Sequence, residues 1–119
     1  MDSEVLKKRT KEFALRIIKL IDALPNTTAG QTIGKQVIRS GTSVAANYRA
    51  VCRARSRPEF ISKLGVVVEE ADETVFWLEI IIESNLLKKE SVASLLQEAN
   101  EITAIMVSAR MTSIRTNKS

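Results

Sequence analysis

Carboxylates are the side chains of this sequence whose spacing could support catalysis or metal binding. Six of them fall in one stretch that has helical periodicity: Glu69, Glu70, Asp72, Glu73, Glu79 and Glu83. Di-iron sites in helix bundles are built from Glu together with Glu-x-x-His motifs. The sequence has no His, so it cannot complete such a site, a His-ligated zinc site or a Ser-His-Asp triad. We expect no catalytic residue, no metal, no cofactor and no enzymatic activity.

Basic side chains form a second chemical pattern, on one face of a helix expected over residues 32–55. The candidate nucleic-acid-binding residues are Lys35, Arg39, Arg49, Arg53, Arg55 and Arg57. No acidic residue lies between Thr32 and Arg57, whereas a face that serves only solubility usually mixes charges of both signs. The planar guanidinium of Arg also suits phosphate and carboxylate groups. A solvated helix face without a partner is the alternative interpretation.

The positive charge is concentrated in the first half of the chain. Residues 1–60 carry 12 Lys or Arg and 5 Asp or Glu, whereas residues 61–119 carry 6 and 9. A further basic cluster lies near the start of the first expected helix, and it consists of Lys7, Lys8, Arg9 and Lys11. These features favour an anionic partner, either RNA or DNA. An acidic protein surface fits as well, because no aromatic residues alternate with the basic ones to stack on bases.

The elements that must position these side chains are helices. Apolar residues recur at helical spacing along the chain, and Pro and Gly are few. Helices are predicted over about residues 3–24, 32–55, 58–85 and 91–110, with a frayed tail over 111–119. Ser3 is the expected cap of the first, and Ser56 or Arg57 that of the third. Four similar helices with short links indicate an all-α, up-down-up-down antiparallel four-helix bundle, as a single domain over residues 1–119.

The third expected helix has apolar side chains on a second face, away from the core. These are Val66, Phe76, Trp77 and Ile80, with Glu69 and Glu73 between them. Large apolar groups on a second face indicate a second burial surface, and Trp is frequent in protein interfaces. We expect an oligomer interface here, although a neighbouring helix or loop could also cover this face. The acids of this helix are expected to pair with arginines of the second helix or of another subunit.

The sequence also bears on the compartment. Its start, MDSEVLKKRT, lacks the apolar stretch of a signal peptide, and no run approaches the roughly 18 apolar residues of a membrane span. The single Cys52 fits a reducing environment and is expected to be a small core residue. These observations predict a cytoplasmic protein without a membrane partner.

Two stretches together resemble a known family. They are RSGTSVAANYRAVCRARSRPEFISKLG, from Arg39 to Gly65, and EEADETVFWLEI, from Glu69 to Ile80. With the similar LPNTTAGQTIGKQVIRS before them, they resemble the bacterial four-helix bundle family of 23S rRNA intervening-sequence proteins over roughly residues 6–110. The combination of SVAANYR, RARS-x-x-EF and ADET-x-x-WLE is specific to that pattern, whereas each motif alone is weak.

The resemblance implies a left-handed four-helix bundle that assembles into a ring-shaped homopentamer. It also implies kinship with the accessory variability determinant of diversity-generating retroelements, a basic pentamer that binds nucleic acid and a reverse transcriptase. The family has no established catalytic residues. Its recurring Asn corresponds to Asn47 and its central acid to Glu73. Its positive surface corresponds to Arg39, Arg49, Arg53, Arg55 and Arg57.

Two functional hypotheses follow. In the first, the chain is a non-enzymatic homo-oligomer that binds RNA or DNA through phosphates. In the second, it is a protein-protein interaction scaffold whose basic residues meet acidic protein surfaces, on a neighbouring subunit or on another protein such as a reverse transcriptase. The complementary acidity of residues 61–119 favours the second hypothesis.

Overall fold

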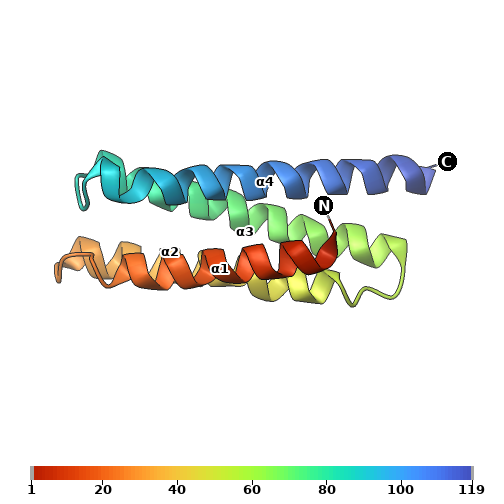
Figure 1. The fold of residues 1–119 in the computed structure, drawn as a ribbon, viewed down its shortest axis with the longest axis horizontal. Coiled ribbons are helices and arrows are strands. Elements are labelled where there is room, and N and C mark those ends of the chain that lie inside the picture. Colours follow the sequence, from red (N-terminus) through yellow and green to blue (C-terminus); the bar gives the residue numbers. More distant parts are fainter. Residues whose placement is uncertain (1, 119) are drawn as a thin grey trace.

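The computed structural model describes residues 2–118, which form four helices in a rod of 51 × 22 × 20 Å. The helices are α1 (Ser3–Ile21), α2 (Thr28–Val51), α3 (Arg57–Glu83) and α4 (Lys89–Lys118). Each runs antiparallel to the one before it (Figure 1). No strand occurs among the described residues. The predicted all-α, up-down-up-down four-helix bundle is therefore confirmed.

Helix α1 is capped and terminated by local backbone chemistry. Asp2 caps it instead of the predicted Ser3, since the Asp2 side chain accepts a hydrogen bond of 3.0 Å from a backbone N–H of the first turn. The helix ends at Ile21, three residues before the predicted end at Leu24. Leu24 precedes Pro25, and the proline ring disfavours the helical conformation of the residue before it.

Helix α2 begins four residues before its predicted start. The Thr27 side chain accepts a hydrogen bond of 3.1 Å from the N–H of Gly30, which caps the helix. Gly30 thus lies inside the helix instead of breaking it. A Cβ at this position would lie 2.1 Å from the carbonyl oxygen of Pro25, so the close approach of the α1–α2 connection explains the glycine. Helix α2 also ends four residues early, at Val51, because the chain must turn back before α3.

Helix α3 has a defined signal at each end. The Ser56 side chain accepts from the N–H of Glu59 at 3.2 Å, which confirms Ser56 as the cap. At the other end Asn85 has a φ of 60°, and it follows a helix that ends at Glu83. The N–H of Leu86 donates to the carbonyl of Ile81 at 3.1 Å, as in a Schellman motif.

Helix α4 is longer than predicted, because it continues through Lys118 where a frayed tail was expected after Arg110. Tertiary contacts account for the difference. The Arg110 guanidinium Nε donates to the carbonyl of Ile61 at 3.1 Å, and Ser113 and Ile114 are half-buried. The end of α4 therefore packs along the start of α3, which a local polarity pattern could not reveal.

The core is a single cluster that all four helices share. Its centre is tight between α1 and α2, where Ile17 is fully buried and faces Gly41. The core also contains a polar contact between α2 and α3, in which the buried Thr74 hydroxyl donates to Ser40 Oγ at 2.9 Å. This hydrogen bond satisfies two polar groups that are buried away from water. Among the helix pairs that are in contact, α1 and α4 pack together least extensively. Arg9 bridges them through Glu98, at 2.6 Å, and Glu101, at 3.0 Å.

Candidate nucleic-acid interface

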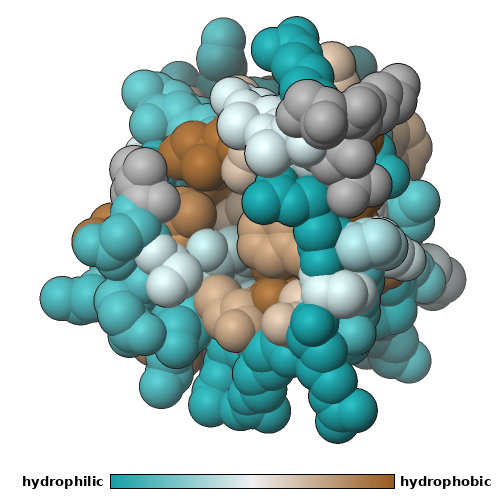
Figure 2. Space-filling view, turned by 90° about the vertical axis from the view of Figure 1, so that its right-hand side faces the viewer, coloured by the Kyte–Doolittle hydropathy of each residue, from teal (hydrophilic) through white to brown (hydrophobic). Residues whose placement is uncertain are grey.

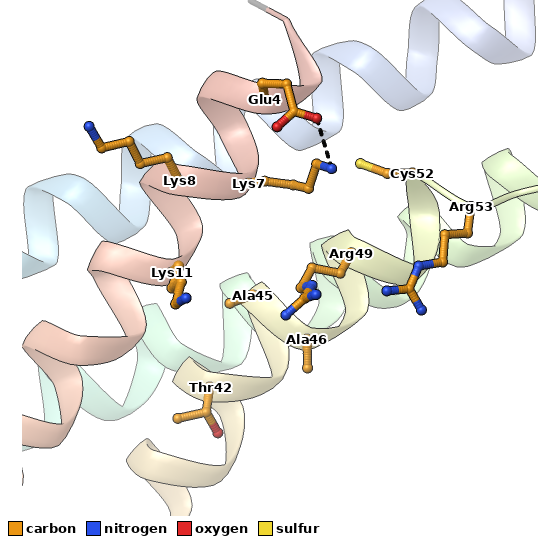
Figure 3. Close-up of a pocket in the computed structure, with 10 residues that line it drawn as sticks. All are labelled: Glu4, Lys7, Lys8, Lys11, Thr42, Ala45, Ala46, Arg49, Cys52 and Arg53. Atoms are coloured by element: carbon orange, nitrogen blue, oxygen red, sulfur yellow. Dashed lines mark ion pairs between the residues drawn. The ribbon is translucent and has the colours of Figure 1, made fainter.

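A groove of about 620 Å³ runs between the first half of α1 and the second half of α2. We call it the basic groove, and Figure 3 shows its lining side chains. The residues that line it are Glu4, Lys7, Lys8, Lys11, Thr42, Ala45, Ala46, Arg49, Cys52 and Arg53. It therefore holds five cations and one carboxylate.

Helical spacing and antiparallel pairing build the basic groove. Lys7 and Lys11 lie four residues apart on α1, and Arg49 and Arg53 lie four residues apart along α2 and its C-terminal end, so each pair shares a helix face. The small side chains of α2 leave the space between these two walls open. Because α2 runs antiparallel to α1, its end lies beside the start of α1 (Figure 1).

The electrostatics of the basic groove are one-sided. Glu4 pairs with Lys7 at 2.8 Å. Lys8, Lys11, Arg49 and Arg53 form no ion pair with any residue that the structure describes, and all four are exposed. The α2 dipole favours cations at its C-terminal end, whereas the α1 dipole disfavours the lysines near its N-terminus. The unpaired cations of the basic groove repel one another, and a bound anion would relieve that repulsion.

Arg39 lies outside the basic groove and is already neutralised. Its guanidinium Nη1 lies 3.2 Å from a carboxylate oxygen of Glu70, and its Nη2 pairs with Glu73. The hydrogen bond to Glu73 raises the pKa of Arg39, and Glu70 adds to the effect. The expected pairing of α3 acids with an α2 arginine therefore occurs within one chain. Arg39 is not part of a continuous basic stripe with Arg49, contrary to the sequence-based prediction.

The other three predicted binding residues lie at the two ends of the rod. Lys35 lines a small hollow of about 270 Å³ at the α1–α2 connection, together with Asn26 and Gln31. Arg55 and Arg57 line another, of about 390 Å³, at the α2–α3 connection. The end of the rod that carries this connection is largely hydrophilic, with apolar surface visible between the polar groups (Figure 2). The structure thus separates the predicted six-residue site into four places.

The lysines of α1 are the part of the site that sequence reasoning only partly recognised. They were expected to add charge near the first helix, without a specified position relative to α2. The packing of the two helices places them, because the register in which Ile17 faces Gly41 brings Lys7 beside Val51. Arg9 of the same cluster points elsewhere, toward α4.

Cys52 lies at one end of the basic groove and is exposed, so its predicted place in the core is wrong. Helix α2 ends at Val51, and Cys52 is its C-cap residue at the surface. Its neighbour Tyr48 is buried. Burial raises the pKa of the Tyr48 hydroxyl, and the nearby Cys52 thiol raises it further.

The outer face of α3 divides into exposed and half-buried residues. Phe76 is 50% exposed and Val66 42% exposed, whereas Trp77 and Ile80 are half-buried. The Phe76 and Trp77 rings meet edge to face, with centroids 4.9 Å apart. Trp77 Nε1 is buried and has no hydrogen-bond partner within the described part of the chain. Core packing thus covers part of the predicted interface and leaves Val66 and Phe76 open.

Metal centres and membrane spans each make specific demands on the side chains of the described residues. No group of three or more His, Cys, Asp or Glu side chains within residues 2–118 could hold a metal ion. None of the helices described has the length and apolar character that crossing a membrane requires.

Comparisons with known proteins agree with this geometry. A family model described as 23S rRNA-intervening sequence protein matches residues 2–108. A crystal structure from Bacteroides thetaiotaomicron VPI-5482, described as a protein with unknown function from the S23 ribosomal protein family, is 37% identical, with a TM-score of 0.85. The match covers 93% of this chain and 99% of that chain. No curated protein matches. The chain therefore belongs to the family of 23S rRNA-intervening sequence proteins.

Proposed function

We propose that this protein is a non-enzymatic homo-oligomer that binds RNA or DNA through phosphates held in the basic groove. The observation that carries the proposal is the juxtaposition of Lys7, Lys8 and Lys11 with Arg49 and Arg53 around a single carboxylate. Cations without internal partners can neutralise phosphates, and the release of the counterions condensed on the nucleic acid drives binding.

The composition of the basic groove indicates the kind of recognition. Its lining includes no aromatic residue that could stack on bases, and its floor carries short side chains. Contacts to phosphates fix position without reading sequence. Binding should therefore tolerate many sequences and weaken steeply as salt rises.

Self-association is the second part of the proposal. The exposed Phe76 and Val66 support an interface on the outer face of α3. The family resemblance implies a pentamer. A ring would repeat the basic groove on every subunit, so that contacts of modest strength combine through avidity.

An acidic protein partner, such as another subunit or a reverse transcriptase, is the alternative occupant of the groove. The intrachain pairs of Arg39 with Glu70 and Glu73 favour nucleic acid over a neighbouring subunit, because they already use part of the acidic face of α3. Charge reversal of Arg49 and Arg53 separates the two hypotheses. It should leave the oligomer intact if the groove binds nucleic acid, and break it if the groove holds another subunit.

The test is fluorescence anisotropy with labelled single-stranded RNA and duplex DNA, between about 50 and 200 mM salt. The Arg49→Glu/Arg53→Glu variant is measured in parallel, with its solution mass determined by light scattering. Salt-dependent binding that disappears in an intact variant oligomer supports the proposal. Absence of binding at the lowest salt, or loss of the oligomer in the variant, would overturn it.

A further inference from the structure

We infer that the basic groove holds one strand of nucleic acid backbone and discriminates against a duplex. This inference rests on the proposed function and names its ligand class more closely. It follows from the shape of the groove and from the way its cations are divided between two walls.

The cations face one another across a narrow space. In Figure 3 the side chains of Lys11 and Arg49 project into the gap between α1 and α2, whereas the end of Lys8 points away from α2. The axes of packed helices lie about 8–10 Å apart and side chains fill the space between them, so the basic groove is a furrow along the surface of the α1–α2 pair. Gly41 against Ile17 allows close approach of this helix pair. A single backbone can lie in such a channel and meet both walls, but a duplex is too wide to enter it.

The spacing along each wall suits successive phosphates. Lys7 and Lys11 are separated by one helical turn, in which four residues rise about 6 Å, and Arg49 and Arg53 have the same sequence spacing across the C-terminal end of α2. This rise is comparable to the step between neighbouring phosphates of an extended strand. A duplex resting on the outside of the groove would contact the tips of the arginines while leaving Lys7 unused.

Glu4 occupies one end of the channel and pairs with Lys7 at 2.8 Å. It is the only carboxylate in the groove lining, so it competes with phosphate for this lysine. Removing its charge should therefore strengthen strand binding. Because a duplex does not reach Lys7, its affinity should change less when the charge of Glu4 is removed.

The experiment compares three labelled probes of about 12 nucleotides, within the range of known single-strand site sizes. They are a mixed-sequence RNA strand, the corresponding DNA strand and the corresponding RNA duplex, each measured by anisotropy against the full chain. We expect both single strands to bind at least about tenfold more tightly than the duplex at equal salt. A difference between the RNA and DNA strands would show whether the 2′-hydroxyl contributes.

Variants assign the effect to the channel. Arg49→Gln/Arg53→Gln should lower the salt slope of single-strand binding by about 1.4, from about 0.7 per lost phosphate contact. Arg55→Gln/Arg57→Gln is the matched control, since it removes two exposed arginines outside the groove, and it should leave the slope unchanged. Glu4→Gln should tighten single-strand binding and steepen the slope.

The outcomes separate the inference from the proposed function. If the duplex binds as tightly as the strands and Arg49→Gln/Arg53→Gln weakens all probes alike, nucleic-acid binding stands and the single-strand inference is overturned. If Arg55→Gln/Arg57→Gln lowers the salt slope as much as Arg49→Gln/Arg53→Gln does, the basic groove is not the nucleic-acid-binding site. If no probe binds, both proposals fail.

Discussion

Replacing Gly41 by Ala should destabilise the fold, because the α1–α2 contact leaves no room for a methyl group. A Cβ at position 41 would lie 2.8 Å from Ile17 Cγ1, 3.1 Å from its Cγ2 and 3.3 Å from its Cβ. Ile17 is fully buried, and its branched side chain has few other rotamers available in a helix. The helices must therefore separate locally, or Ile17 must adopt a strained rotamer.

The magnitude follows from two opposing terms. Overpacking of a core costs about 1–3 kcal/mol, whereas Gly→Ala inside a helix gains up to about 1 kcal/mol. The net loss in the free energy of unfolding should be about 1–2 kcal/mol. For a chain of 119 residues, the melting temperature should fall by about 4 °C per kcal/mol.

Urea unfolding followed by circular dichroism measures this loss, at one fixed protein concentration because self-association would shift the midpoint. Gly34→Ala is the matched control. Its Cβ would lie 3.3 Å from Leu24 Cδ1, the end of a flexible and half-buried side chain. This variant should be neutral or more stable than the parent.

A second substitution tests the cause directly. Ile17→Ala alone should cost about 2–5 kcal/mol, as for other large-to-small core changes. The Ile17→Ala/Gly41→Ala double variant should lose less stability than the sum of the two single variants, because the Ile17 Cγ atoms that clash with a Cβ at position 41 are absent. A double-mutant cycle measures this difference. Additive effects, or a Gly41→Ala variant as stable as the parent, would refute the assigned contact.

Three further predictions concern ionisation and capping. Glu98→Gln should lower the free energy of unfolding by about 1–3 kcal/mol, since it breaks a charge-assisted bond to Arg9, as urea titration would show. The hydrogen bond from Arg9 lowers the pKa of Glu98, so this stabilisation is present above the ordinary glutamate pKa and is lost as pH falls through the lowered value. The free energy of unfolding of Glu98→Gln should therefore decrease less steeply at acid pH than that of the parent. An unchanged acid dependence would contradict the assigned Arg9–Glu98 pair. Burial raises the pKa of Tyr48, so the contribution of its protonated hydroxyl to the free energy of unfolding is complete below the unfolded-state pKa of about 10 and declines above it. The Tyr48→Phe variant should therefore lose less stability than the parent between neutral and strongly alkaline pH. Ser56→Ala should cost about 1 kcal/mol through loss of the α3 cap, whereas the nearby exposed Ser62→Ala should cost much less in the same thermal melts.

The sequence predicted most of the fold because the signals for helices are local. Apolar periodicity identified four helices, and Ser56 was one of the two residues expected to cap α3, since its hydroxyl can accept from an N–H three residues later. Asn85 marks the end of α3 for an equally local reason, since Asn tolerates a positive φ. The errors lie at helix ends. The expected start of the second helix at residue 32 missed its first turn, where Gly30 packs against the carbonyl of Pro25.

The candidate site was predictable in its residue types but not in its grouping. A helical wheel gives the angle of a side chain around its own axis, and it placed Arg39, Arg49 and Arg53 on one face. It cannot show that Glu70 and Glu73 of another helix neutralise Arg39. A helical wheel also cannot show which part of α1 lies beside a given part of α2.

The sequence by itself thus determined that the chain forms four amphipathic helices, that it contains no histidine chemistry, and that its basic residues gather in the first half. The tertiary structure alone decided which of these cations act together. The register of α1 against α2, held by Ile17 on Gly41, brings Lys7 and Lys11 opposite Arg49 and Arg53. The physical reason is that periodicity reports on neighbours within one helix, whereas a groove forms between two helices whose relative position depends on packing.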